Sequence, residues 1–202
     1  AEGAYNGIAL IKLMGRDSGF IAANAALSVQ EVNFVLVPEM EFDLYGPHGF
    51  LKVLRKRLEE RHHAMIVVAE GAGQYFFENN DQRPDASGNV KHKDIGVYLK
   101  EKITEEFEAK GMNFSIKYID PSYIIRSAAA NAIDSKFCSV LAQNAVHAAM
   151  AGKTDFVVGH WNNCFTLLPI PKAVEKRKKI DLESELWWNV LETTGQPVSM
   201  KD

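Results

Sequence analysis

The sequence predicts an α/β fold in which a parallel sheet lies between layers of helices. Short apolar runs, such as GIALIKL at 7–13 and AMIVVA at 64–69, contain almost no polar residues. Such runs are typical of parallel strands that are covered on both faces. They alternate along the chain with segments whose apolar residues recur every three or four positions, as in amphipathic helices. This alternation favours parallel pairing through right-handed crossovers.

The first part of the chain contains three predicted strands and two predicted helices. In order, we expect a strand at 7–13, a helix at 20–27, a strand at 34–37, a helix at 50–58 and a strand at 64–69. The first helix follows a tight turn, and Asp17 or Ser18 is available as its N-cap. The second strand stops at Pro38-Glu39, and the third ends in Glu70.

The second part continues the alternation after a polar segment. Between Glu78 and Lys93 the chain is rich in Asn, Asp, Gly and Pro, which predicts a long mobile loop. In order, we then expect a helix at 94–110, a strand at 114–119, a helix at 132–151, a strand at 156–159, an extension of its sheet at 166–170 and a final helix at 182–191.

Composition narrows the function classes. The formal net charge of −3 over 202 residues gives no general attraction to nucleic acid, so an anionic ligand needs a local cluster of donors. No apolar run approaches the roughly 18 to 20 residues of a membrane helix, and the N-terminus lacks signal-peptide organisation. Cys138 and Cys164 fit neither a disulfide scaffold nor a metal site, so we interpret them as structural or incidental thiols of a cytoplasmic protein. Because the chain begins at Ala1, we expect a processing or cloning boundary there.

Three candidate ligand groups stand just beyond predicted strands, at the edge where parallel α/β sheets bind ligands. Gly15-Arg16 combines a turn that lets the backbone approach a ligand with a guanidinium suited to phosphate. Glu70 can accept hydrogen bonds from two hydroxyls, which suits a polyol. Arg126 follows the strand at 114–119 and can emerge on the same edge. If these groups converge, they make a site for a phosphorylated sugar.

Ordinary structural roles remain open for the same residues. A Gly-Arg turn is more often structural or part of a surface ion pair, and Glu70 can be the polar end of a strand. Tyr123 can lie in the core while Arg126 pairs with an acidic neighbour.

Other charged residues favour structural readings. His147, on an Ala-rich helix, is more often a packed core histidine than a catalyst. The basic run at 172–179 is most simply an exposed face rather than a phosphate site. The chain has no phosphate loop, dinucleotide fingerprint, nucleophile elbow or Mg²⁺-binding carboxylate pattern.

The order of these motifs resembles the phosphofructokinases. The string KLMGRDSGFIA at 12–22 is similar to their fructose 6-phosphate-binding motif, in particular that of the plant-type ATP-dependent and pyrophosphate-dependent branch. The likeness continues, in order, through Pro38-Glu39, VVAEGAGQ at 67–74, YIDPSYIIR at 118–126 and NAVHAAMAG at 144–152. It covers nearly the whole chain.

The resemblance implies a three-layer parallel-sheet domain of the phosphofructokinase type, with part of a second α/β domain. Residues 1–126 would bind fructose 6-phosphate, 127–168 would return to a donor domain, and 169–202 would pack back as a C-terminal helix. The implied ligands of the sugar phosphate are Met14, Gly15, Arg16, Glu70, Tyr123, Ile124, Ile125 and Arg126. The implied enzyme transfers a phosphoryl group from ATP or pyrophosphate, with Mg²⁺, to the 1-hydroxyl of fructose 6-phosphate. It would be a cytoplasmic homo-oligomer that binds neither nucleic acid nor membrane.

The chain also departs from the family. In phosphofructokinases a Thr-Ile-Asp-Asn-Asp-type segment with the catalytic Asp and a Gly-Gly-Asp-type donor loop precede Met-Gly-Arg, and neither occurs here. We therefore assign no catalytic or metal-binding residue, and we expect the isolated 202-residue chain to be inactive. The stretch Asn162-Asn163-Cys164 is less basic than the resemblance implies, and no cross-subunit arginine stands before Met14.

The sequence also predicts one surface feature, and it leaves two other functional interpretations open. The helix at 132–151 should show an exposed apolar face unless a partner covers it. A non-catalytic sugar-phosphate-binding or regulatory module is the alternative function. An α/β domain without a ligand is the third reading.

Overall fold

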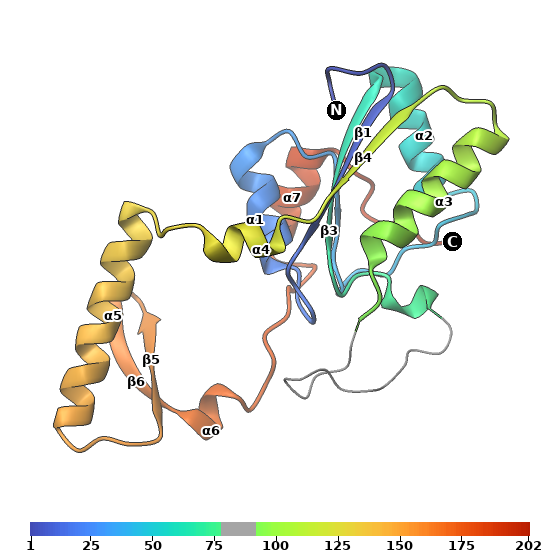
Figure 1. Cartoon of the computed structure of the whole chain (residues 1–202). Helices are drawn as coiled ribbons and strands as arrows, with labels where there is room; N and C mark the ends of the chain where they lie inside the picture. The colour runs from blue at the N-terminus through green and yellow to red at the C-terminus, as the bar shows by residue number, and fades with distance from the viewer. Residues whose placement is uncertain (78–91) are drawn as a thin grey trace. The chain divides into compact units, whose positions relative to one another are not determined.

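The α/β architecture predicted from the sequence is confirmed by a computed structural model, which describes residues 1–77 and 92–202 (Figure 1). The loop predicted between Glu78 and Lys93 lies outside the described residues, apart from its last two positions. The chain divides into two compact units: Ala1–Ile125 with Lys179–Asp202, and Arg126–Lys178. We call them the first unit and the second unit.

The first unit is built on a four-stranded parallel sheet. Its strands are β1 (Gly7–Leu13), β2 (Phe34–Leu36), β3 (His63–Ala69) and β4 (Ser115–Ile119), in the order β2-β3-β1-β4. Leu13 of β1 pairs with Ala69 of β3, the last residue of that strand, and Ile11 pairs with Ile119, the last residue of β4. Three strands therefore end at one edge of the sheet, and the chain segments that follow them begin there.

Helices cover both faces of this sheet, which gives three layers. They are α1 (Phe20–Val29), α2 (Phe50–Arg61), α3 (Ile95–Ala109) and α7 (Glu185–Thr194), with a 3₁₀ turn, η1, at Gln74–Phe76. Figure 1 shows α1 and α7 on one side of the strands and α2 and α3 on the other. The apolar stripe predicted for α3 is fully buried, as are Phe50, Leu54 and Leu58 of α2. The core of the first unit lies in these two interfaces.

The predicted N-cap of α1 is wrong. The cap residue is Gly19, which has no side chain to cap with, and neither Asp17 nor Ser18 takes this role. The carboxylate of Glu39, beyond β2, accepts the Gly19 N–H at 3.1 Å to each oxygen, and it also accepts the Ile180 N–H at 2.9 Å. A carboxylate 20 residues away in sequence thus replaces the local cap, which a search of adjacent residues could not find.

The outer edge of β2 is occupied by a side chain. Gln196, buried beyond the end of α7, accepts the Val35 N–H at 2.6 Å through Oε1 and donates from Nε2 to the Val35 carbonyl at 3.3 Å. Both backbone groups of Val35 are therefore satisfied by one carboxamide.

The second unit consists of a long helix, a hairpin and one helical turn. These are α5 (Ala132–Met150), β5 (Phe156–Trp161), β6 (Cys164–Pro169) and α6 (Ile170–Ala173). β6 extends the sheet of β5 as predicted, but the two strands pair antiparallel, so the prediction of parallel strands throughout is wrong here. Asn162 and Asn163 connect them at φ angles of 46° and 60°. A two-residue turn with positive φ joins antiparallel strands, which accounts for these two asparagines.

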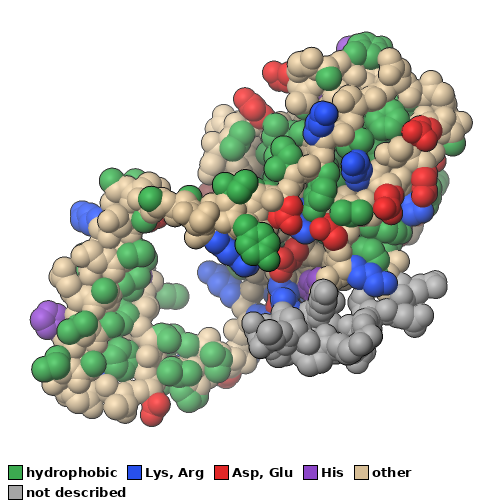
Figure 2. Space-filling view, in the orientation of Figure 1, with side chains coloured by type: hydrophobic (Ala, Val, Ile, Leu, Met, Phe, Trp, Pro, Cys, Tyr) green, Lys and Arg blue, Asp and Glu red, His purple; other side chains and the backbone are tan. Residues whose placement is uncertain are grey.

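The second unit buries almost nothing. Among its residues only Ala148 is buried, at 9% exposure, and α5 carries the exposed side chains of Ile133, Phe137, Val146 and Met150. Hydrophobic side chains are visible on the surface of this unit in Figure 2. The predicted exposed apolar face of α5 is confirmed for this chain, whereas the prediction of a packed core position for His147 is wrong, because His147 is exposed.

Two remaining predictions concern exposure and membranes. Residues 172–179 are exposed, as expected for a solvated basic run. Within residues 1–77 and 92–202, every helix is too short or too polar to cross a membrane.

Candidate functional site

The ends of β1 and β3 bring two predicted site residues together. Arg16 lies three residues beyond β1 and Glu70 directly follows β3, and Arg16 Nε is 4.0 Å from Glu70 Oε1. Both side chains are about one third exposed, at 29% and 32%. The contact is longer than a direct hydrogen bond, so it is a loose ion pair at a solvent-accessible edge. The strand register explains it, because Leu13 and Ala69 are paired neighbours.

Two glycines allow the loops at this edge to touch. Gly15 has φ +147°, and a Cβ built on it would lie 2.6 Å from the Ser18 carbonyl oxygen. A Cβ on Gly71 would lie 1.8 Å from the Arg16 carbonyl oxygen. The Gly71 N–H donates to the Gly15 carbonyl at 3.0 Å, and the Glu70 N–H to the Leu13 carbonyl, also at 3.0 Å. Glycine at 15 and 71 is therefore required by backbone conformation and by close approach.

The predicted site residues after β4 lie on a short helix. Helix α4 (Ser122–Ser127) exposes Tyr123 at 82%, Ile124 at 71% and Ile125 at 47%. The alternative that placed Tyr123 in the core is wrong. Arg126 is the first residue of the second unit and is exposed, so its predicted convergence with Arg16 and Glu70 stays a prediction.

A cluster of charged residues that the sequence analysis missed lies at the same edge. Lys12, near the end of β1, places Nζ 2.6 Å from Asp94 Oδ2 and 2.9 Å from Asp120 Oδ2. The Tyr118 hydroxyl is 2.9 and 3.0 Å from the two Asp94 oxygens and donates to that carboxylate. We call these four residues, Lys12, Asp94, Tyr118 and Asp120, the lysine cluster.

The lysine cluster fixes the charge of its members. Burial works against the charge of Lys12, but hydrogen bonds to Asp94 and Asp120 outweigh it and raise the pKa of Lys12. Burial likewise works to raise the pKa of Asp94, while hydrogen bonds from Lys12, the Val97 N–H and Tyr118 lower it overall. Burial, followed by the hydrogen bond to Asp94, raises the pKa of Tyr118 to about 12. At neutral pH the lysine is charged, the carboxylates are ionised and the phenol is neutral.

His92 is a second residue that the sequence analysis missed. Its Nδ1 is buried and has no hydrogen-bond partner within the described part of the chain. Burial lowers the pKa of His92, the positive charge of Arg16 lowers it further, and Glu70 acts in the opposite direction. A neutral imidazole therefore stands in the electrostatic field of the Arg16–Glu70 pair. A single His at the end of a polar segment gives no sequence signal for this position.

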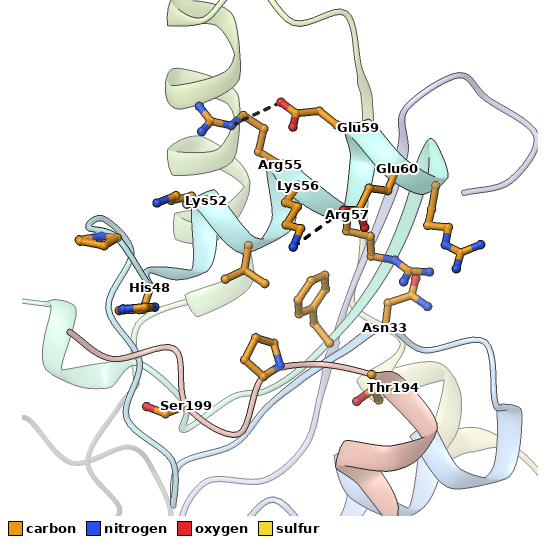
Figure 3. Close-up of a pocket in the computed structure, with 16 residues that line it drawn as sticks. Asn33, His48, Lys52, Arg55, Lys56, Arg57, Glu59, Glu60, Thr194 and Ser199 are labelled. Atoms are coloured by element: carbon orange, nitrogen blue, oxygen red, sulfur yellow. Dashed lines mark ion pairs between the residues drawn. The ribbon is translucent and has the colours of Figure 1, made fainter.

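A cavity of about 760 Å³ lies elsewhere on the first unit, between α2 and the residues that follow α7 (Figure 3). It is lined by basic side chains of α2, two of which form ion pairs on the helix: Arg55 Nε lies 3.6 Å from Glu59 Oε1, and Lys56 Nζ lies 3.9 Å from Glu60 Oε1. Burial, and then the charge of Arg61, lower the pKa of Arg57 in this wall. The cavity contains none of the predicted sugar-phosphate residues.

Known proteins match the chain along most of its length. The family model described as Phosphofructokinase matches residues 1–149. The ATP-dependent 6-phosphofructokinase of Borreliella burgdorferi is 54% identical over 208 residues, which cover 100% of this chain and 46% of that protein. The ATP-dependent 6-phosphofructokinase 5, chloroplastic, of Arabidopsis thaliana is 45% identical over 98% of this chain and 36% of that protein. The chain thus spans less than half the length of these relatives.

A solved structure shares the fold. The pyrophosphate-dependent phosphofructokinase from Marinobacter aquaeolei aligns with a TM-score of 0.64 at 17% identity, over 96% of this chain and 48% of that chain. At this identity the likeness supports the fold alone.

Proposed function

Since the chain belongs to the phosphofructokinase family, we propose that it forms the sugar-phosphate-accepting part of a 6-phosphofructokinase. Such an enzyme transfers a phosphoryl group to the 1-hydroxyl of fructose 6-phosphate and gives fructose 1,6-bisphosphate. The chain would bind and orient the acceptor, and the rest of the enzyme would supply the donor.

The observation that carries this proposal is the pairing of Arg16 with Glu70 at the shared end of β1 and β3. Each side chain is partly exposed, and the two glycines beside them let the loops after β1 and β3 pack closely, which holds Arg16 next to Glu70. The carboxyl edge of a parallel sheet is the place where α/β folds bind ligands. A guanidinium and a carboxylate side by side match a ligand that carries both anionic oxygens and hydroxyls.

We assign roles to the individual groups on this basis. Arg16 donates hydrogen bonds to oxygens of the sugar phosphate, and Glu70 accepts hydrogen bonds from its hydroxyls. Met14 and Gly15 contact the sugar phosphate beside these two residues. In the proposed complex, the α4 residues Tyr123 to Arg126 close over the ligand, with Arg126 as the second guanidinium.

The donor and its metal ion belong to another part of the enzyme. We propose ATP or pyrophosphate as the donor: the sequence relatives are ATP-dependent enzymes, and the string at 12–22 resembles the branch that uses either donor. Within the described residues, no group of three or more His, Cys, Asp or Glu side chains is arranged to hold a metal ion. The described residues therefore do not fit a Mg²⁺ site.

Three broader properties are part of the proposal. The enzyme would be cytoplasmic, which suits the exposed free thiols of Cys138 and Cys164. It would be a homo-oligomer, and sedimentation of the full-length enzyme would test this. The donor domain would cover the apolar face of α5.

Titration calorimetry with fructose 6-phosphate tests the acceptor site. We expect the chain to bind, and Arg16→Met to weaken binding about 10- to 150-fold, because a hydrogen bond to a charged group contributes about 1.5–3 kcal/mol. Arg55→Met is the matched control, since Arg55 pairs with Glu59 on α2 and not with the strand ends. Equal affinity of wild type and Arg16→Met would exclude this site.

A coupled kinase assay separates the enzyme from the non-catalytic module. We expect no turnover from the 202-residue chain and normal turnover from the full-length protein. Mass spectrometry of the 202-residue chain should confirm that it is intact in the assay. Normal turnover by the chain alone would contradict the division of roles. Sugar-phosphate binding by a full-length protein without turnover would favour the regulatory module instead.

A further inference from the structure

Lys12 connects three elements whose ends meet at the candidate site. It stands two residues before Met14, near the end of β1, and its side chain is only 13% exposed. A lysine is rarely this buried unless its ammonium is paired. Here the ammonium is paired twice, with Asp94 and Asp120, which are 82 and 108 positions further along the chain.

The first partner ties Lys12 to the start of α3. Asp94 is the N-cap of this helix, and its Oδ1 accepts the N–H groups of Gly96 at 2.9 Å and Val97 at 3.1 Å. Gly96 lets the Tyr118 ring lie against the first turn, because a Cβ there would be 2.2 Å from Tyr118 Cε2. The Tyr118 hydroxyl then completes the hydrogen bonding of the Asp94 carboxylate.

The second partner ties Lys12 to the start of α4. Asp120 follows β4 directly, and its Oδ1 accepts hydrogen bonds from both the Ser122 N–H, at 3.1 Å, and the Ser122 hydroxyl. Its other oxygen, Oδ2, receives Lys12 Nζ. One carboxylate therefore joins the first residue of α4 to the end of β1. The two oxygens of Asp120 bind different partners. The turn at Ser122 is therefore held by Oδ1 and does not depend on the ion pair between Oδ2 and Lys12.

We propose that Lys12 is a positioning residue of the acceptor site, which fixes where α4 begins relative to the Met14–Arg16 turn. The inference rests on the proposed function, because α4 carries the residues proposed to close over fructose 6-phosphate. Lys12 acts through Asp120 and contacts no proposed ligand atom itself. Without the ammonium, Asp94 and Asp120 would be two carboxylates held close together with no cation between them. The start of α4 would also lose its ion pair to β1, and it has no buried side chain to hold it in place.

The test uses the 202-residue chain and two measurements. Amide hydrogen exchange at Ile125, whose N–H donates to the Pro121 carbonyl at 2.8 Å, reports on α4 without any ligand. Calorimetry with fructose 6-phosphate reports on the site. In Lys12→Met we expect exchange at Ile125 to accelerate about tenfold and the Kd to rise about tenfold, as for residues coupled within one network. Exchange in β1 and β3 should stay at the wild-type level.

Three further variants make the result specific. Asp120→Asn removes the charge on the α4 side and keeps the Asp94 cap, so it should reproduce both effects even if Lys12→Met fails to fold. Lys12→Arg keeps the cation and should recover most of the affinity. Lys102→Met is the matched control, because it breaks another lysine ion pair of similar length, 2.7 Å to Glu105, on the exposed side of α3.

The two proposals fail in different ways. If wild type does not bind fructose 6-phosphate, the proposed function fails, whatever the exchange data show. If α4 exchange in both Lys12→Met and Asp120→Asn equals that of wild type, the positioning role is overturned, whether or not the chain binds the sugar phosphate. Faster exchange with an unchanged Kd also overturns it, because the lysine would then hold α4 without serving the site.

Discussion

The two units of the chain differ in how they use their apolar residues. In the described residues, every buried hydrophobic side chain except Ala148 belongs to the first unit, which packs helices on both faces of its sheet. The second unit has a helix of 19 residues and a hairpin, yet it leaves Phe137, Val146 and Trp161 exposed. The difference teaches that the first unit can be stabilised by its own core, whereas the second needs a surface to pack against.

The largest expected effect separates the cores of the two units. Phe50 is fully buried and packs edge-to-face on Phe34 and Phe42, so Phe50→Ala should cost about 3–5 kcal/mol of the free energy of unfolding. Phe137→Ala, at 40% exposure, should cost less than about 1 kcal/mol in this chain. Urea unfolding of the two variants measures both values. Equal losses would contradict this difference, and would show that the contacts of Phe137 with His160 and Phe165 stabilise the second unit as strongly as Phe50 stabilises the first.

A Gly→Ala substitution in each unit tests how tightly the two units are packed around single residues. A methyl group at Gly96 would meet the Tyr118 ring at 2.2 Å, so Gly96→Ala should destabilise the first unit by about 1–3 kcal/mol despite the better helix propensity of alanine. At Gly159 in β5 the nearest atom, Thr166 Cγ2, is 3.6 Å from the added methyl. Gly159→Ala should therefore be neutral or stabilising, by up to about 1 kcal/mol. A loss of stability at position 159 would show that the hairpin is packed more tightly than this.

Substitutions in the turn between β5 and β6 should affect the stability of the second unit alone. Asn163 has φ 60°, which asparagine tolerates better than other residues that carry a Cβ. Asn163→Ala should cost about 1 kcal/mol of hairpin stability and raise amide exchange in β5 and β6 about fivefold, while Asn163→Gly keeps wild-type exchange. Identical exchange in the two variants would indicate that this turn does not set the pairing.

The smallest effect is a pH dependence of the first unit. Because Asp94 has a pKa below its ordinary value of 3.8 in the folded chain, its ionised form stabilises the fold above that value. This contribution is lost as the pH falls from 3.8 through the lower pKa of the folded state. Asp94→Asn should therefore flatten the decline of unfolding free energy below about pH 4, as measured by denaturant titration at several pH values. A curve that keeps the wild-type slope would contradict the role of this carboxylate.

The strands of the first unit could be predicted almost to the residue, because the signal for a buried strand lies within the strand's own sequence. A run such as GIALIKL at 7–13 reads as a buried strand whatever it packs against, and β1 has these bounds. The meeting of Arg16 and Glu70 also followed, because parallel strands end at one edge. These features depend only on the order of residues along the chain.

The features that were missed depend on partners far away in sequence. Lys12 reads as the one polar residue of an apolar strand, and its partner Asp94 lies 82 residues later. The cap of α1 comes from Glu39 rather than from its own turn. His147 was expected in a core because its helix is rich in Ala, but its side chain is exposed. The sequence pattern indicates which residues favour burial or ion pairing. Only the tertiary structure shows which residues they contact.

The carboxamide of Gln196 has a consequence for how copies of the chain behave towards one another. β2 is a three-residue strand at the border of the sheet, and the outward N–H and carbonyl of such a strand invite a strand from another molecule. At Val35 both groups are already bonded to Gln196. A single side chain thereby hinders intermolecular β-sheet growth at this border, where a strand from another molecule would have to displace Gln196.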